Sequence, residues 1–133
     1  MPHCRWMTRA SPRNARPPGL RIRLVFEDGE MIGPGKADLL EAIRETGSIA
    51  EAGRRLGMSY KRAWTLVETL NATFAEPVVE SRRGGAGFGG AALTALGETA
   101  LSHYRRLQAK AARASAAEVA ALRRLRADSA ERK

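Results

Sequence analysis

The N-terminal part of the chain shows alternating apolar and polar positions. Residues 20–26 alternate, with every second residue apolar on one face, which predicts a half-buried β-strand. Asp28-Gly29 is a turn signal, and residues 30–32 return as a second short strand, so the pattern predicts an N-terminal β-hairpin. Such a hairpin can cover a core, or it can also pair in a dimer. The residues expected on its apolar face are Leu20, Ile22, Leu24 and Phe26.

A helical period follows the hairpin. The run Gly33-Pro34-Gly35 ends the second strand, and a helix is expected from Lys36 to about Glu45. Gly47 ends this helix. Its core face is expected to carry Leu39, Leu40 and Ile43.

Residues 47–71 have the pattern of two short amphipathic helices joined at Gly57. Ser48 can cap the first helix, with Glu51 completing a capping box, and Ser59 can cap the second. A glycine at the turn adopts a left-handed conformation at little cost. This spacing predicts a helix-turn-helix, in which the second helix reads DNA bases. The apolar faces are Ile49, Ala52, Gly53 and Leu56 in the first helix, and Ala63, Leu66, Val67 and Leu70 in the second; the small residues Ala52, Gly53 and Ala63 allow a close helix crossing.

A β-hairpin is expected after the second helix. Residues 77–81 form a β-branched, alternating segment, and residues 84–90 are rich in glycine. Arg82 and Arg83 precede the glycines, so the hairpin would be a basic wing that reaches phosphates or the minor groove. The glycines also suit a linker. A phosphate-cradling catalytic loop is disfavoured, because the run lacks a Lys-Ser/Thr end.

The last segment predicts a long helix from Thr94 to Arg113. One side of it is apolar, and a second apolar stripe after Ser115 belongs to a separate helix or to a continuation. A helix of this length has more apolar surface than one small domain covers, which favours a partner subunit. Coiled-coil pairing is one form of that hypothesis, although the heptads are irregular. The expected dimer contacts are Leu101, Tyr104 and Leu107, and the second stripe is Val119, Leu122 and Leu125.

The outer face of the second helix carries the candidate chemistry. At 100° per residue Lys61, Thr65 and Glu68 point away from the apolar stripe. Basic side chains there can contact guanine or phosphates, threonine can contact phosphate or thymine methyl, and Glu68 can accept from cytosine. An ordinary solvated helix face is the alternative. The candidate DNA contacts are Ser48, Ser59, Tyr60, Lys61, Arg62, Thr65, Arg82 and Arg83.

The string Met58-Ser59-Tyr60…Ala63-Trp64, with Asn71, Glu76-Pro77, the glycine-rich wing and Leu93-Thr94…Gly97, resembles the DNA-binding domain of ModE-type molybdate-responsive regulators. The resemblance covers about residues 20–110 and extends more distantly to LysR-type winged helices. It implies a winged helix-turn-helix that binds DNA. Full-length members carry C-terminal β-rich molybdate-binding domains, and the sequence after residue 95 is too rich in alanine, arginine and leucine to build them. Residues 11–14, Ser-Pro-Arg-Asn, are similar to an anion motif of those domains but lie in a proline- and arginine-rich tail.

Composition fits one small domain with a polyanionic partner. The 133 residues carry a net charge of +9, placed mainly at the two ends: +6 in residues 1–23 and +5 in residues 94–133. A single cysteine, Cys4, excludes an intramolecular disulfide and fits the reducing cytoplasm. No apolar run is long enough for a signal peptide or a membrane span. Met7 is an alternative start to Met1.

The sequence therefore predicts an α+β winged helix-turn-helix with an extra N-terminal β-hairpin and a long C-terminal helix. We expect a disordered basic tail at residues 1–19, the DNA-binding domain at 20–113, and a basic helical or partly disordered extension at 114–133. The expected function is that of a cytoplasmic, homodimeric transcription regulator that binds double-stranded DNA. No catalytic residues, metal site or cofactor are expected. The alternatives are a sensor that binds a small ligand or oxyanion at a dimer interface, and a protein-interaction adaptor that has lost DNA binding.

Overall fold

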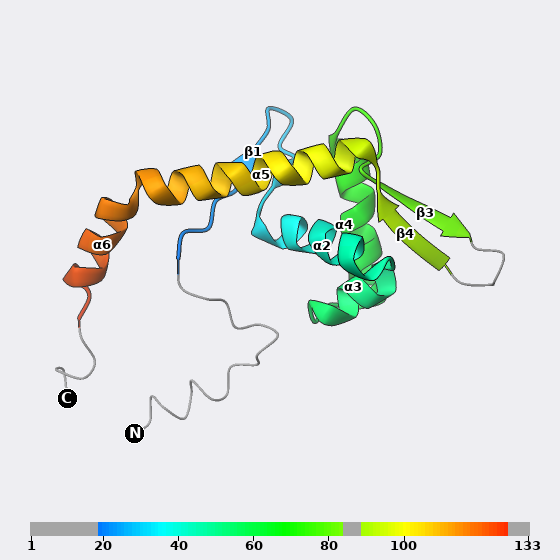
Figure 1. Ribbon diagram of the computed structural model, residues 1–133, viewed down its shortest axis with the longest axis horizontal. Helices are drawn as coiled ribbons and strands as arrows, with labels where there is room; N and C mark the ends of the chain where they lie inside the picture. The colour runs from blue at the N-terminus through cyan, green and yellow to red at the C-terminus, as the bar shows by residue number, and fades with distance from the viewer. Residues whose placement is uncertain (1–18, 84–88, 128–133) are drawn as a thin grey trace, which may run out of the picture.

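A computed structural model of the chain describes residues 19–83 and 89–127. The described elements, in chain order, are two short strands, three helices, a β-hairpin and two further helices. Figure 1 shows the longest helix running along one side of the molecule, with the hairpin of strands β3 (Val79–Arg83) and β4 (Gly89–Leu93) projecting at one end. The expected α+β architecture is confirmed. The tail expected at residues 1–19 lies, up to residue 18, outside the described residues.

The core is built around α2 (Pro34–Thr46), which begins two residues earlier than expected because Pro34 fits the first helical turn. Leu39, Leu40 and Ile43 are fully buried, as the helical period predicted. Gly47 ends the helix in the left-handed conformation, with φ of 72°. Its carbonyl oxygen accepts a hydrogen bond from Ala91 N, at 2.9 Å, so the end of α2 is connected to the second hairpin.

The helix-turn-helix consists of α3 (Ile49–Arg55) and α4 (Tyr60–Thr73). Ser48 Oγ accepts from Glu51 N, and Ser59 Oγ accepts from Arg62 N, so both predicted N-caps are confirmed. The reciprocal half of the capping box was expected from Glu51, whose carboxylate instead accepts from Arg54. Gly57 has φ of 76°, which explains a glycine at the turn.

The two helices cross closely at small residues, as expected. A Cβ placed on Gly53 would lie 3.0 Å from Ala63 Cβ, which leaves no room for a larger side chain without a shift. Ala52 is also fully buried at this crossing. The buried side of α4 consists of Ala63, Val67 and Leu70, and Leu66 is half-buried.

The wing is the antiparallel hairpin of β3 (Val79–Arg83) and β4 (Gly89–Leu93). The first strand was expected at residues 77–81, and that prediction was two residues too early. Pro77 has no N–H to donate to a ladder, and strand pairing begins with Val79 opposite Leu93. The wing tip, residues 84–88, lies outside the described residues.

The N-terminal hairpin is shorter and more exposed than predicted. Strand β1 (Leu24–Val25) pairs with β2 (Met31–Ile32), and Leu20 and Leu24 are exposed although the alternation placed them on an apolar face. The turn at Asp28-Gly29 is confirmed, with Asp28 Oδ1 accepting from Glu30 N. On the inner side, Ile32 is buried and Phe26 meets Phe74 edge to face, with ring centroids 6.1 Å apart. The hairpin therefore covers one side of the core and leaves apolar surface on the other.

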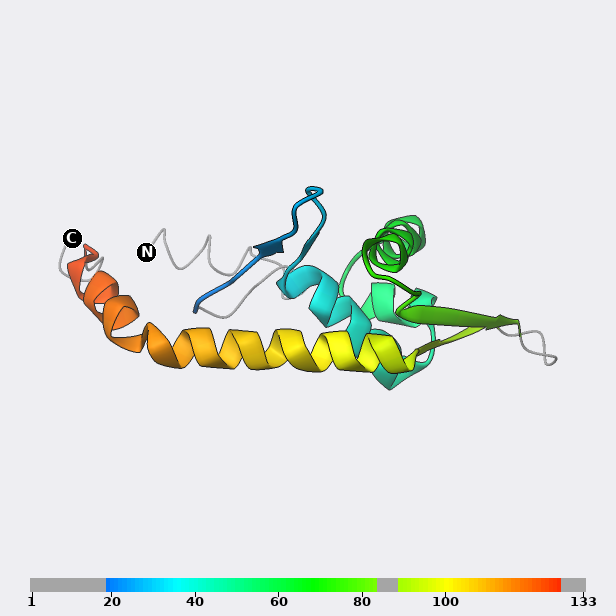
Figure 2. The ribbon, with the colours of Figure 1, turned by 90° about the horizontal axis from the view of Figure 1, so that it is seen from above.

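Helix α5 (Ala95–Ala114) is capped by Thr94 and has the predicted length. A break at Ser115 separates it from α6 (Ala116–Leu125), so the second apolar stripe belongs to a separate helix. No residue of α6 is buried, and Leu122 and Leu125 are 65% and 79% exposed. Figure 2, seen from above, shows α6 and the wing at opposite ends of α5, with α2 between α5 and the first hairpin.

Candidate nucleic-acid interface

The outward face of α4 is the first part of the candidate interface. Lys61, Thr65 and Glu68 are exposed, whereas Ala63 and Val67 on the opposite side of the helix are buried. Tyr60 is 57% exposed and packs edge to face against the half-buried Trp64, with ring centroids 6.1 Å apart. The aromatic pair lies on the first two turns of α4, beside the basic residues.

Lys61 and Arg62, the cations of this face, differ from several arginines of the fold in their partners. Arg54, Arg55 and Arg105 are each engaged with carboxylates. Within residues 19–83 and 89–127, no ion pair includes Lys61 or Arg62. A cation that is not paired in this way has no internal ion pair to give up when an anion approaches.

The three candidate hydroxyl side chains differ in the hydrogen bonds that they make. Ser48 and Ser59 use their oxygens as acceptors for helix N–H groups, which leaves each hydroxyl hydrogen able to donate outward. Thr65 Oγ1 instead donates to Lys61 O, at 3.0 Å. Thr65 therefore presents its methyl group more readily than a hydroxyl donor.

The base of the wing is fixed to α4 by Asn71, a role that the residue pattern did not predict. Asn71 Oδ1 accepts from the backbone N–H groups of Val78 and Val79, at 2.8 and 3.0 Å. Its Nδ2 donates to Val79 O at 3.2 Å. One amide side chain thus satisfies three backbone groups where the chain leaves the recognition helix. Asn71 stands six positions before Pro77-Val78-Val79 in the sequence, but only the fold shows that these positions meet.

The same base is fixed to α5 from the other side. Thr94 Oγ1 donates to Pro77 O at 2.7 Å and accepts from Gly97 N at 3.0 Å. Gly97 packs directly on the backbone of Val78: a Cβ there would lie 2.1 Å from Val78 O. The wing is therefore held between α4 and α5 at its root.

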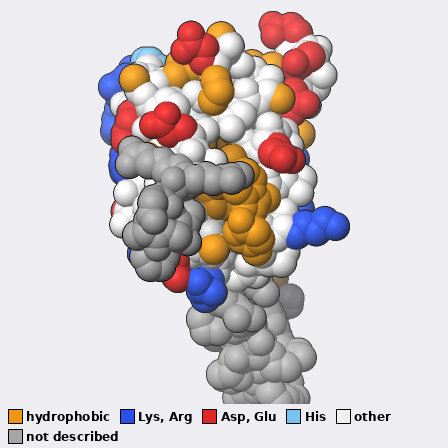
Figure 3. Space-filling model, turned by 90° about the vertical axis from the view of Figure 1, so that its right-hand side faces the viewer, with side chains coloured by type: hydrophobic (Ala, Val, Ile, Leu, Met, Phe, Trp, Pro, Cys, Tyr) orange, Lys and Arg blue, Asp and Glu red, His pale blue; other side chains and the backbone are white. Residues whose placement is uncertain are grey.

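The two wing arginines are placed only by their backbones. Arg82 pairs with Gly90 and Arg83 with Gly89, at the end of the ladder farthest from Asn71. Their side chains, like residues 84–88, are outside what the structure describes. Figure 3 shows the face from which the wing projects, where hydrophobic side chains gather in the middle, acidic ones lie above them, and basic ones lie at the margins.

Two of the three residues expected to form the dimer contact are buried within their own chain. Leu101 and Tyr104 are 1% and 3% exposed, so neither offers surface to a second copy. Tyr104 Oη donates to Ile22 O at 2.5 Å, which connects α5 to the chain just before β1. Burial raises the pKa of Tyr104. The apolar stripe of α5 suggested a dimer contact at these two residues, but this part of the stripe faces the core of its own subunit. Leu107 remains half-buried.

Arg105 joins α5 to α2, a connection that the residue pattern did not indicate. Its guanidinium contacts Asp38 at 3.0 Å and Glu41 at 2.5 Å. Partial burial acts against its charge, but hydrogen bonds to the two carboxylates outweigh that effect and raise the pKa of Arg105. These contacts join Arg105 to residues that precede it by 67 and 64 positions in the chain.

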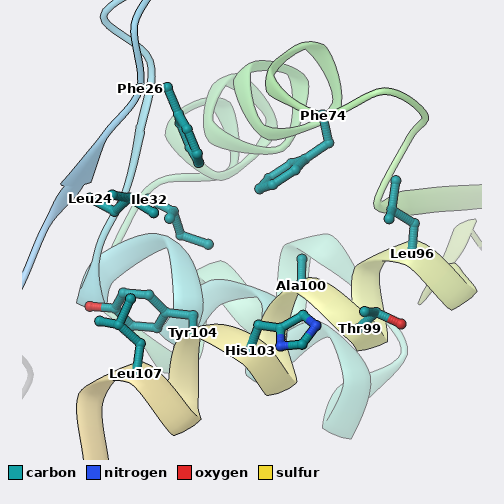
Figure 4. A pocket seen from close by; sticks show the side chains of 10 residues that line it. All are labelled: Leu24, Phe26, Ile32, Phe74, Leu96, Thr99, Ala100, His103, Tyr104 and Leu107. Carbon is teal, nitrogen blue, oxygen red and sulfur yellow. The ribbon is translucent and has the colours of Figure 1, made fainter. Parts of the chain in front are cut away.

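An apolar pocket of about 270 Å³ lies between the first hairpin, the end of α4 and α5. Figure 4 shows Phe26 and Phe74 on one side of it and residues of α5 on the other. The β1 residue Leu24 and the α5 residue Leu107 lie at its walls. Among the described residues there is no cluster of three His, Cys, Asp or Glu that could hold a metal ion. The described helices include none that is long and apolar enough to cross a membrane.

Comparisons with known proteins agree with this geometry. Residues 36–98 match the family model described as bacterial regulatory helix-turn-helix protein, lysR family. The chain is 42% identical over 85 residues to the molybdenum-pterin-binding protein MopB of Rhodobacter capsulatus, covering 64% of this chain and 32% of that protein. It is 41% identical over 83 residues to the transcriptional regulator ModE of Yersinia pestis, covering 62% and 32%.

A solved structure, the complex of the CbnR DNA-binding domain with DNA, matches with a TM-score of 0.53 and 27% identity, covering 66% of this chain and 95% of that one. The chain spans about a third of the length of the curated relatives it matches. The match to the family model runs from α2 to the first turn of α5, and includes the helix-turn-helix and the wing. This part of the chain is therefore a winged helix-turn-helix that is similar to those of the lysR-type regulatory family, and it is similar in sequence to the ModE regulators.

Proposed function

We propose that this chain binds double-stranded DNA sequence-specifically, as a homodimer, and acts as a transcription regulator. The observation that carries the proposal is the outward face of α4, where Lys61 and Arg62 are exposed and have no acidic partner in the described ranges. In helix-turn-helix proteins the second helix lies in the major groove, with its N-terminal residues against base edges. The relatives named as ModE regulators and the CbnR complex with DNA support the same function.

Each candidate residue has a part in this proposal. Lys61 contacts guanine or phosphate, Arg62 and Tyr60 contact the backbone beside it, and the Thr65 methyl group meets thymine. Ser48 and Ser59 donate their free hydroxyl hydrogens to phosphates at the ends of α3 and α4. Arg82 and Arg83 place the wing against the adjacent minor groove or its phosphates. Because the face around the wing has mixed charges (Figure 3), affinity would depend on these few cations and not on a broad positive field.

The dimer contact proposed from the sequence is revised by burial. Leu107 stays in the proposal, and Leu24 replaces the buried Leu101 and Tyr104, because Leu24 is 40% exposed beside the apolar pocket. Leu122 and Leu125 of α6 are further exposed apolar side chains, beyond the end of α5. A second copy that covers these side chains would remove them from water, which is the main favourable term in association.

An oxyanion sensor is disfavoured by the character of the pocket. Its lining is almost entirely apolar. Tyr104 and His103 are the titratable side chains in it, and His103 already contacts Arg106. Burying an oxyanion there without donors would be costly. An apolar side chain of a second subunit suits the pocket better.

The proposal is tested by selecting a preferred duplex from random DNA with the purified full chain, and then comparing variants on it. Lys61→Ala should lose about 1–3 kcal/mol of binding free energy on that duplex, with an unchanged melting temperature. Lys110→Ala is the matched control, because Lys110 is an exposed lysine on α5, away from α4. Equal affinities for Lys61→Ala and the parent would contradict the assignment of α4 as the reading helix.

A further inference from the structure

A basic groove lies beside the recognition helix, on the side away from the wing. It has a volume of about 810 Å³ and is bounded by the segment before β1, the start of α2 and the turn between α3 and α4. Both views of the ribbon place α4 between these elements and the wing (Figures 1 and 2). The groove and the wing therefore lie on opposite flanks of the helix.

The charges that line the groove are all of one sign. Arg21, Arg23, Lys36 and Arg62 contribute basic side chains, and none of the described residues that line it is acidic. The acidic residues of the first hairpin lie at its turn, whereas Arg23 and Gly33 lie at its opposite end, next to the paired residues Leu24 and Ile32. The groove thus concentrates positive charge from three separate parts of the chain.

Arg23 is held in place without being neutralised. A Cβ on Gly33 would lie 2.8 Å from Arg23 Cγ, so the aliphatic stem of the arginine lies across this glycine. Its guanidinium contacts only a thioether in the described residues, Met31 Sδ at 3.6 Å. A thioether is a weak acceptor and carries no charge. The fold therefore positions the stem of Arg23 and leaves most of its donors available.

Lys36, in the same groove, uses one of its donors within the fold. Its Nζ donates to Met31 O at 3.0 Å, and no carboxylate among the described residues forms an ion pair with it. Arg62 and Ser59 belong both to the groove and to the first turn of α4. The groove is therefore continuous with the face that reads DNA in the proposed function.

We propose that this groove binds the phosphodiester backbone of DNA that borders the major groove occupied by α4, with Arg23 as its principal contact. The inference rests on the proposed function and adds a second flank to it. With the first turn of α4 among the base edges, the strand next to that turn passes the residues that α4 shares with the basic groove. Arg23, Lys36 and Arg62 then meet successive phosphates, while the wing holds the other flank. Such contacts fix register and carry no base information.

The test compares Arg23→Gln, which keeps the stem over Gly33, with the parent full chain on the preferred duplex and on an unrelated duplex. Affinity should fall by roughly two- to fivefold on both, as for an exposed charge pair. The plot of log K against log salt should flatten by about 0.9 if one phosphate is no longer neutralised. Arg113→Gln, an exposed arginine on α5, is the charge-matched control and should leave the slope unchanged. Ethylation interference with the variant should no longer mark a phosphate on the flank opposite the wing.

The outcomes separate the inference from the proposed function. A parent that binds no duplex specifically would overturn the function and the inference together. Specific binding by the parent with the same salt slope for Arg23→Gln would overturn the groove alone. Arg23→Lys should restore the slope; if it flattens the slope as much as Arg23→Gln does, the side chain acts through packing and the inference fails. A titration with inorganic phosphate at constant ionic strength, followed by NMR, should not saturate the groove. Saturation at micromolar phosphate would show that the groove is a site for a free anion and would overturn the inference.

Discussion

Single residues at the wing root carry much of the architecture. Asn71, Thr94 and Gly97 belong to different segments, yet they meet around the backbone of Pro77 and Val78. Their positions were marked in the sequence by family resemblance, without a physical role. The reason is that their partners are backbone atoms 3 to 19 positions away, and side-chain patterns do not report such contacts. A buried backbone group without its partner costs about as much as a missing hydrogen bond.

Gly97→Ala should destabilise the domain. The added Cβ would lie 2.1 Å from Val78 O, a backbone atom that can move only with the wing. Overpacking of this kind costs about 1–3 kcal/mol, which exceeds the gain of about 1 kcal/mol from alanine in a helix. Thermal unfolding measures the difference. Gly35→Ala in α2 is the control, since nothing lies within 4 Å of its added Cβ; equal melting temperatures for the two variants would contradict the close approach.

Tyr104→Phe should lower the free energy of unfolding by about 1 kcal/mol at neutral pH, because it removes the bond to Ile22 O. The parent should also lose stability at alkaline pH. Burial raises the pKa of Tyr104 in the folded state, so its contribution is complete below the tyrosine pKa of the unfolded chain and falls as pH rises through the folded value. Tyr60→Phe, at an exposed ring, is the control for denaturant titrations at neutral and alkaline pH. A phenylalanine variant with the parent's alkaline profile would show that another group causes the loss.

At the scale of elements, helices were predicted better than strands. The 3.6-residue period predicted α3, α4 and α5 closely, and the caps at Ser48 and Ser59 marked where α3 and α4 begin, because both signals are local. Strand positions depend on pairing partners. Alternation at residues 20–26 therefore predicted a long strand, although only Leu24 and Val25 pair. The basic groove was not predicted at all, since it joins residues 21–23 to residues 56–66.

The wing leads to a prediction at this scale. Replacing both Arg82 and Arg83 with alanine should weaken binding to all duplexes by a similar factor, because phosphate contacts do not distinguish sequences. The log K against log salt slope should flatten by about one for each phosphate that the wing no longer neutralises. The matched control is Arg123→Ala with Arg124→Ala on α6, which removes the same charge. A slope that does not change in the wing variant would mean that the wing does not meet the backbone.

The whole molecule is longer than its core requires. Helix α5 contacts the wing root at its start and α2 in its middle, and its last turns continue beyond the rest of the domain to α6 (Figure 2). The sequence predicted the length of α5 and its surplus of apolar surface, but not which apolar residues face inward. That choice depends on where the first hairpin and α2 lie, and only the assembled fold decides it.

Leu107→Glu should shift the proposed homodimer toward monomer. A carboxylate at the wall of the apolar pocket would have to be desolvated on association, which is costly without a partner charge. Sedimentation velocity at micromolar concentration should show a dimer for the parent and a smaller species for the variant. Ser102→Glu adds the same charge to α5 at an exposed position and should stay dimeric. A monomeric parent that still protects one asymmetric half-site would contradict the homodimer.

The continuity of α5 has a geometric consequence for the DNA that the proposed dimer accepts. The 20 residues of this helix span about 30 Å, and its first turn is fixed to the wing root. With a subunit contact near Leu107, the distance and the rotation between the two reading helices are set by a rigid rod and not by a linker. In each of the two subunits, a residue added between Arg105 and Leu107, after the contacts of α5 with its own core, would lengthen that rod by about 1.5 Å and turn the reading helix by about 100° about it. Operator spacing is in this sense encoded as a residue count within one helix.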